Sequence, residues 1–152
     1  MTKDISLSVL KKLRALSGAG VMACRRALEE AGGDIKKAQA ILKKESAALA
    51  EKKAARETKE GIIAAYIHAG GKVAAVVVLS CETDFVARTD DFKKLAYELA
   101  MQVAAMNPEN VEALLEEDYI RNPRLKVADL IKEVVGKTGE NIKIKEFSRF
   151  EV

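Results

Sequence analysis

The ten residues Ser80-Cys-Glu-Thr-Asp-Phe-Val-Ala-Arg-Thr89 join two segments of opposite character. The apolar run before them, residues 72–79, contains four valines and is short and β-branched, which favours a strand. After them, Asp90 and Asp91 introduce a Leu- and Ala-rich pattern with helical periodicity. The stretch therefore connects a strand to a helix and predicts a mixed α+β organisation for this part of the chain.

Within this stretch, the residue types at positions 83 and 84 are those that begin helices. Thr83 is an N-cap candidate, and Asp84 falls in the first turn, where the helix dipole favours a carboxylate. Phe85 then projects from the start of a short helix at the end of a sheet. A phenylalanine beside a helix cap more often belongs to its own protein's core. The pattern alone leaves both a buried and an exposed Phe85 open.

The chain on either side of this stretch extends the α+β pattern. Two strand-like runs, 62–68 and 73–79, flank Gly70-Gly71 and predict a β-hairpin. A helix follows from about residue 91 to residue 106, and Asn107-Pro108 ends it. Its apolar face is formed by Phe92, Leu95, Ala96, Leu99, Val103 and Met106.

The remaining C-terminal sequence predicts further helix and a third strand. Residues 111–120 are acidic and partly helical in pattern, and Asn122-Pro123 breaks that pattern. Apolar positions then mark another helix that stops near Gly139. These positions are Val127, Leu130, Ile131, Val134 and Val135. The final run, 142–152, begins as an alternating strand.

The third strand raises a question about which face of the sheet is covered. Phe147 falls on the face opposite to the other large apolar residues of the run, so either the strand bulges or both faces are covered. Those other residues are Ile142, Ile144 and Phe150. A sheet of three strands has too few helices of its own to cover both faces. We therefore expect an uncovered apolar face, which is typical of an interface.

The first 46 residues predict a compact bundle of three short helices. Ser6 or Ser8 can cap the first helix, Gly32-Gly33 ends the second, and Asp34 caps the third. The apolar positions are Val9, Leu10, Leu13 and Leu16, then Cys24, Ala27, Leu28 and Ala31, then Ile35, Ala38, Ile41 and Leu42. About 40 residues is near the lower size limit for an independent fold.

The segment that follows the bundle predicts a tether. Residues 47–60 are alanine-rich, charged and free of Gly and Pro, which favours a semi-rigid helical linker. The predicted organisation is thus a three-helix head (1–46), a helical linker (47–60) and an α+β core (61–152). In the core, a small antiparallel three-stranded sheet packs with helices.

Composition and charge exclude several classes of protein. With 49% apolar and 32% charged residues the chain has a globular composition, and the apolar run 73–81 is less than half of a membrane span. Residues 1–60 hold 14 Lys and Arg against 8 Asp and Glu, whereas residues 61–152 hold 12 against 15. The basic half lacks aromatic residues, so we expect no membrane binding and no direct nucleic-acid binding.

No enzyme site can be assembled from the sequence. The two cysteines, Cys24 and Cys81, form no metal-binding pair, and the single His68 has no nucleophile at a suggestive spacing. A thiolate at Cys81 is disfavoured by the adjacent Glu82. There is no G-x-x-x-x-G-K-[ST] phosphate loop. We therefore expect a protein that is not an enzyme and needs no cofactor or metal.

Two separate motifs resemble one known family. Cys81-Glu-Thr-Asp-Phe-Val-Ala-Arg88 is similar to the signature of elongation factor Ts. Independently, Gly18-Ala-Gly-Val-Met-Ala-Cys-Arg-Arg-Ala-Leu28 and Gly33-Asp34-Ile35 resemble the head of that family, a bundle of the ubiquitin-associated type. The sequence has one core half and no heptad run, so it resembles the short form of the family.

The resemblance implies a translation factor that binds elongation factor Tu and promotes GDP release, after which GTP rebinds. It implies that Thr83, Asp84, Phe85 and Val86 disturb the partner's Mg²⁺ and phosphate site. The head residues that it implies as further contacts are Arg14, Val21 and Met22. Val21 stands where the family usually has a second methionine, and Val21 or Met22 can instead fill the interior of the small bundle.

Partners and location follow from the same resemblance together with the composition. We expect a homodimer, because the short form of the family pairs two core halves and the predicted sheet leaves one face uncovered. We expect a cytoplasmic protein, because the N-terminus lacks the features of a secretory signal. Two other classes stay open: an interaction adaptor that binds something other than a GTPase, and an RNA-binding translation protein.

Overall fold

The computed structural model describes residues 4–152, so residues 1–3, where the predicted head begins, lie outside the description. The described chain is α+β, as the sequence predicts, with helices on one side of an antiparallel sheet. The helices are α1 (Leu7–Ser17), α2 (Val21–Glu30), α3 (Ile35–Lys53), α4 (Asp84–Ala87), α5 (Asp90–Met106), α6 (Val111–Glu116) and α7 (Val127–Thr138). The strands are β1 (Glu60–Ile67), β2 (Val73–Cys81), β3 (Asp118–Tyr119), β4 (Asn122–Lys126) and β5 (Lys143–Glu151).

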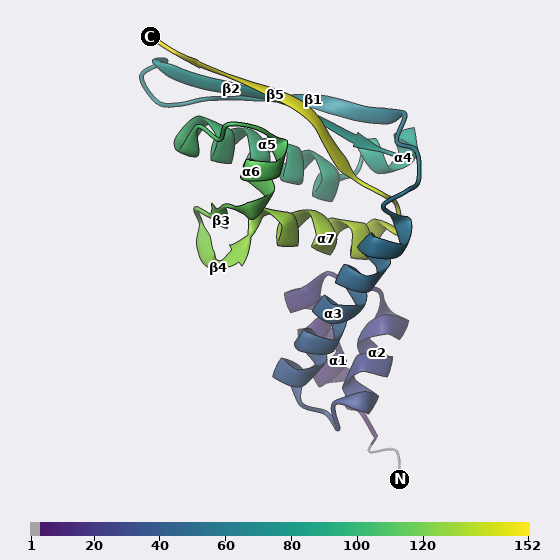
Figure 1. Cartoon of the computed structure of the whole chain (residues 1–152). Coiled ribbons are helices and arrows are strands. Elements are labelled where there is room, and N and C mark those ends of the chain that lie inside the picture. The colour runs from purple at the N-terminus through teal and green to yellow at the C-terminus, as the bar shows by residue number, and fades with distance from the viewer. Residues whose placement is uncertain (1–3) are drawn as a thin grey trace.

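The main sheet has the order β1-β2-β5, with both neighbouring pairs antiparallel. Helix α5 packs along one face of this sheet, α7 lies below α5, and α3 leads from α7 down to the N-terminal helices (Figure 1). The larger hydrophobic cluster fills the space between the sheet, α5 and α7. The inward side chains of β2 alternate along the strand and are fully buried. They are Ala75, Val77, Leu79 and Cys81.

A β-bulge in β5 resolves the question about its faces. The register of β2 against β5 shifts between Val78, which pairs with Glu146, and Leu79, which pairs with Ile144, so Lys145 is the extra residue. Phe147 consequently lies opposite Val77 on the helix-covered face. Phe150 pairs with the outward-facing part of β2 and is 61% exposed. The bulge, not a second covering layer, is thus the correct alternative.

The outer face of the sheet carries apolar side chains that none of the helices within residues 4–152 covers. Ile63 and Ile67 of β1 are 71% and 68% exposed, and Phe150 of β5 lies two strands away on the same face. Between them, Val76 and Val78 of β2 are half-buried. Single exposed apolar residues are ordinary, but a continuous patch across three strands is typical of an interface.

A second, smaller hydrophobic cluster lies among α1, α2 and α3 and defines the head. Its buried members are Leu13, Cys24, Ala27, Leu28, Ala38 and Leu42. The caps are those expected from the sequence: the Ser6 side chain accepts from Val9 N, and the Asp34 side chain accepts from Lys37 N. Gly32 and Gly33 follow α2 with positive φ angles.

The linker differs from its prediction in where the helix ends. Helix α3 runs from Ile35 to Lys53 without a break at residue 46, because no Gly or Pro interrupts it. Residues 54–59 are not helical, and β1 begins at Glu60. A single helix therefore belongs to the head at its start and to the core at its end.

The contact between α3 and α7 depends on a glycine. A Cβ atom added at Gly136 of α7 would lie 2.6 Å from the Cβ of Ser46 on α3 and still closer to its Oγ. Only a residue without a side chain allows the two helices to approach this closely. Gly136 and Ser46 thus set the separation of α3 and α7, through which the head is attached to the core.

The sequence analysis missed a second sheet. Strands β3 and β4 form an antiparallel pair where Asn122-Pro123 was interpreted only as a break. Pro123 is tolerated because β4 has one neighbour and its free edge needs no further donor. The pair is held by Tyr119, whose hydroxyl donates to buried Glu98 at 2.5 Å, and by Arg121, which pairs with the same carboxylate at 3.0 Å.

Candidate functional site

The predicted site lies on a single helical turn at the end of β2. The Thr83 side chain accepts a hydrogen bond from Val86 N at 3.4 Å, so Thr83 is the N-cap of α4 as the sequence predicts. Val86 and Ala87 face the core and are buried. Phe85, on the other side of the same turn, is 78% exposed. Of the two alternatives for Phe85, the structure has the exposed one.

Thr83 is held from across the fold by Glu140. The Glu140 carboxylate accepts from Thr83 N at 2.9 Å and from Thr83 Oγ1 at 2.7 Å. Both bonds have a charged acceptor and are therefore stronger than bonds between neutral groups. The sequence analysis missed Glu140, which lies 57 residues from Thr83 along the chain and carries no local signal of this contact.

The residue after Glu140 ties the same loop to two other segments. Asn141 N donates to the Glu82 carboxylate at 2.8 Å, and Asn141 Nδ2 donates to the carbonyl oxygen of Arg56 at 2.7 Å. Arg56 also forms an ion pair with Glu82 at 3.4 Å. The bond from Asn141 N, reinforced by Arg56, lowers the pKa of Glu82 below its ordinary value. Asn141 itself is buried and was also missed from the sequence.

Cys81 lies under this turn and is chemically quiet. Its side chain is fully buried and its Sγ donates to the carbonyl oxygen of Thr83 at 3.1 Å. Burial, with the negative charge of Glu140 adding to it, raises the pKa of the Cys81 thiol to about 11. The direction agrees with the prediction from the sequence, but Glu82 is not the cause. At neutral pH the group stays a thiol, so it is a poor nucleophile.

Asp84 is exposed to solvent and pairs within its own turn. Its carboxylate lies 3.0 Å from the Arg88 guanidinium, with side-chain exposures of 48% and 75%. Such an exposed pair contributes about 1 kcal/mol or less and breaks easily. Asp84 is therefore available to another molecule next to Phe85.

The predicted head residues lie at the surface. Met22 is 72% exposed and Val21 is 42% exposed, so neither fills the interior of the bundle. Arg14, near the end of α1, is exposed as well. Leu13 and Leu28 fill the interior instead.

The loop between α1 and α2 lies against the end of α7, which also contacts the start of α5. Gly18 of this loop contacts Lys137 at the end of α7, since a Cβ at Gly18 would lie 2.6 Å from Lys137 Cε. The Lys137 ammonium lies 4.0 Å from Asp91, in the first turn of α5 just after the motif. Lys137 thus links the loop before α2 to the first turn of α5.

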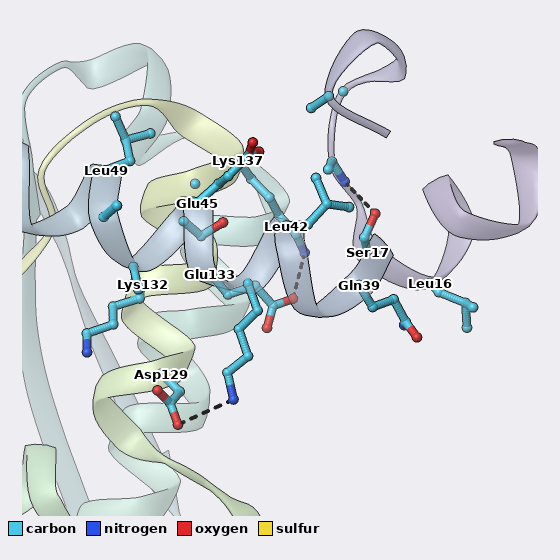
Figure 2. Close-up of a pocket in the computed structure, with 18 of the residues that line it drawn as sticks. Leu16, Ser17, Gln39, Leu42, Glu45, Leu49, Asp129, Lys132, Glu133 and Lys137 are labelled. Atoms are coloured by element: carbon cyan, nitrogen blue, oxygen red, sulfur yellow. Dashed lines mark hydrogen bonds and ion pairs between the residues drawn. The ribbon is translucent and has the colours of Figure 1, made fainter. Parts of the chain in front are cut away.

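A cavity lies between the head and the core and contains none of the predicted site residues. Its volume is about 670 Å³, and it is bounded by α3 on one side and α7 on the other (Figure 2). Figure 2 shows Glu133 reaching Lys137, and the ion pair between Lys43 and Asp129 crosses from α3 to α7 at 3.9 Å. The cavity is the space left between α3 and α7 beside the closely packed pair Ser46 and Gly136.

Neither a cluster of metal-ligating side chains nor a membrane-crossing helix is found among residues 4–152. Within residues 4–152, no group of three or more His, Cys, Asp or Glu side chains is placed to hold a metal. Among the helices of that same part of the chain, none combines the length and the apolar character needed to cross a bilayer. What the site offers is an exposed aromatic ring beside an exposed carboxylate on a firmly held turn.

Comparison with known proteins agrees with the resemblance seen in the sequence. The family model described as Elongation factor TS matches residues 82–152. Elongation factor Ts of Thermotoga petrophila is 45% identical, with 98% of this chain and 96% of that protein covered. Those of Herpetosiphon aurantiacus and Carboxydothermus hydrogenoformans are 38% and 39% identical, covering 98% and 97% of this chain and 98% and 89% of theirs.

This chain is shorter than those relatives. The alignment with the Thermotoga petrophila protein extends over 192 positions, 40 more than the 152 residues of this chain. The relative therefore carries at least 40 residues without a counterpart here. Even so, the alignment covers 98% of this chain, so it includes both the head and the core. With such likeness over nearly its whole length, the chain belongs to the elongation factor Ts family of translation elongation factors.

Proposed function

We propose that this protein binds elongation factor Tu and accelerates the release of GDP from it, so that GTP can rebind. The observation that carries the proposal is Phe85, a large apolar ring that is 78% exposed on a turn fixed by buried neighbours and charged hydrogen bonds. An exposed side chain on a rigid support loses little conformational entropy on binding. Phe85 is therefore suited to wedge between elements of a partner.

The proposed activity is exchange by binding alone, without catalysis of a chemical reaction and without a cofactor. The exchange factor must bind the empty GTPase more tightly than the nucleotide-loaded one, and each tenfold loss of nucleotide affinity needs ~1.4 kcal/mol of such coupling. In GTPases, Mg²⁺ bridges the phosphates and protein oxygens. The turn from Thr83 to Val86 supplies the means of disturbing that site: Phe85 displaces packed groups and Asp84 competes for polar ones, while buried Val86 attaches the turn to the core.

The head supplies a second contact in this proposal. Met22 is flexible and exposed, which suits it to an apolar contact with the GTPase, and Arg14 and Val21 flank it. Because the Lys137 contacts place the loop before Val21 at the same end as the first turn of α5, both regions can bind one partner. Linking two contacts raises the overall affinity without new interactions.

The proposal includes a homodimer formed by the outer face of the sheet. The patch with Ile63, Ile67 and Phe150 runs across all three strands, and an identical copy presents the same apolar shape. Light scattering on Ile63→Asp should give half the mass of the wild type. A wild-type protein that is monomeric at micromolar concentration contradicts the dimer. We also propose that the protein acts without binding a membrane or nucleic acid. Its proposed location is the cytoplasm.

The test of the exchange function is the release of fluorescent GDP from elongation factor Tu. The wild type should accelerate release, and Phe85→Ala should lose most of that acceleration while its circular dichroism stays unchanged. Leu7→Ala is a matched control, because Leu7 is 73% exposed but lies outside the proposed contacts. Excess GDP should also dissociate the complex, since the coupling is reciprocal. Unaltered release rates with Phe85→Ala would rule out the assigned role.

A further inference from the structure

The turn that carries Phe85 is too short to hold its own orientation. Helix α4 has four residues, and a single turn fixes several dihedral angles for very few hydrogen bonds. Its cap bond, from Val86 N to Thr83 Oγ1, is long at 3.4 Å. The turn therefore depends on groups outside it.

Glu140 supplies those groups and also determines how Thr83 caps the turn. The hydroxyl of Thr83 has one proton, and it donates this proton to Glu140 at 2.7 Å. Its lone pairs are then free to accept from Val86 N. The backbone of Thr83 is fixed by the same carboxylate, through the bond from Thr83 N at 2.9 Å. One side chain thus sets both the backbone and the hydroxyl of the cap.

Glu140 is itself held on a rigid support. It follows Gly139, whose φ of 74° is the left-handed conformation that ends α7, and Gly139 N donates to the carbonyl oxygen of Val135 at 2.8 Å. On its other side, buried Asn141 donates to Glu82 and to the carbonyl oxygen of Arg56. The loop therefore connects the end of α7, the end of β2 and the segment after α3.

We propose that Glu140 is a positioning residue for nucleotide exchange, which acts through Thr83 to hold Phe85 in its binding orientation. The inference rests on the proposed exchange function and adds a residue that lies outside the motif. Glu140 does not need to touch the GTPase. Its contribution is to raise the fraction of molecules in which the turn, and with it Phe85, is set for binding.

The expected kinetic effect is specific to positioning. In Glu140→Ala the head contacts remain, so the variant should still bind the GTPase, and its half-saturating concentration should rise by less than the maximal rate falls. The maximal rate of GDP release should fall about tenfold, which corresponds to a turn that is correctly set in about one molecule in ten. Glu140→Gln should be intermediate, because its amide oxygen can still accept from Thr83 N.

A second measurement does not involve the GTPase. Amide hydrogen exchange of the peptide that spans residues 82–87 should be faster in Glu140→Ala, since Thr83 N loses its acceptor and Val86 N depends on the oriented hydroxyl. The control is Glu98→Gln, which weakens a different carboxylate, one that is buried and bonded to Tyr119 and Arg121 on the helix-covered side of the sheet. Glu98→Gln should lower the melting temperature but leave unchanged both the amide hydrogen exchange of residues 82–87 and the rate of GDP release.

The outcomes separate this inference from the function on which it rests. If the wild type does not accelerate GDP release, the exchange function fails. If the wild type is active and Glu140→Ala has the same maximal rate, the positioning role is overturned. The role is also overturned if Glu98→Gln lowers the maximal rate as much, since general destabilisation then explains the loss. Should Glu140→Ala not fold, a maximal rate of Glu140→Gln equal to the wild type overturns the role, and a reduced one supports it.

Discussion

The head and the core each present an exposed apolar side chain, but they support it differently. Met22 of the head is 72% exposed and Phe85 of the core is 78% exposed. The core beneath Phe85 contains twenty buried residues in one cluster, whereas the cluster of the head contains six. The turn of Phe85 is also bonded to Glu140 through Thr83, while α2, which carries Met22, packs mainly against α1 and α3.

This difference indicates that the core provides a stable support, whereas the head provides a more adaptable contact. A cluster of six buried residues gives the head a small stability of its own, so it should open locally more often than the core. A flexible methionine on the head can adapt to a partner's surface. A phenylalanine that must displace packed groups needs the rigid support that the core provides. Four measurements test whether the head and the core differ in this way.

The largest expected effect comes from cavities made in the two clusters. Leu99 and Leu28 are both fully buried, the first in the core and the second in the head. Leu99→Ala should lower the global free energy of unfolding by about 3 kcal/mol, the usual cost of such a cavity. Leu28→Ala should make the head unfold at a lower urea concentration, while the urea midpoint of the core stays unchanged. One shared transition with equal losses in both variants would show that the head and the core unfold as a unit.

The second effect is a loss of stability in alkali that arises at Cys81. The pKa of its thiol is about 11 in the folded protein, above the ordinary value near 9, so the unfolded chain loses its proton first. The free energy of unfolding should therefore fall between pH 9 and pH 11, by about 2 kcal/mol for this group. Urea titrations of the wild type and Cys81→Ser at pH 8, 9, 10 and 11 measure it. Parallel curves for the two proteins would contradict this origin.

The third effect uses the two cysteines as natural probes, one in each cluster. Cys24 and Cys81 are both fully buried, so a thiol reagent reaches each only when its own cluster opens. In the single-cysteine variants, Cys24 should react at least tenfold faster than Cys81, which corresponds to an opening free energy lower by about 1.4 kcal/mol. Equal labelling rates would mean that the head does not open independently.

The smallest effect tests the attachment between the two regions. Gly136→Ala places a Cβ against Ser46 and should push α3 from α7, but the better helix propensity of alanine offsets part of the cost, leaving about 1 kcal/mol. Ser46→Gly in the same protein makes room for the new methyl group and should restore the stability. Calorimetry of the wild type, the two single variants and the double variant provides a double-mutant cycle. A double variant no more stable than Gly136→Ala would refute the close contact as the cause.

Much of this architecture could be predicted because its signals are local. The caps Ser6, Thr83 and Asp34 lie within three residues of the amides that they bind, and Gly139 ends α7 as its position suggests. The helical periodicity of residues 91–106 likewise reports one buried face. Such features depend on neighbours in the sequence, so the sequence is sufficient to find them.

Most of the missed features depend on partners far away in the chain. Glu140 and Asn141 follow a helix like ordinary loop residues, and only folding brings them to Thr83 and Glu82. Gly136 lies within a helical pattern where a glycine costs about 1 kcal/mol, and its reason is a serine on another helix. The pair of β3 and β4 is the exception, because Tyr119 and Asn122 are only three residues apart, and Pro123 is typical of a break rather than of a strand.

By itself, then, the sequence determined the order and the ends of most helices and strands, the exclusion of common enzyme motifs and the resemblance of its two motifs to one family. These properties follow from dihedral preferences, periodicity and short-range capping, which act over a few residues. The tertiary structure alone decided that Phe85 points outward, that a bulge at Lys145 turns Phe147 inward, and that Glu140 holds the turn. Whether a side chain is buried or exposed, and what fixes it, is set by groups that only the folded chain brings within bonding distance.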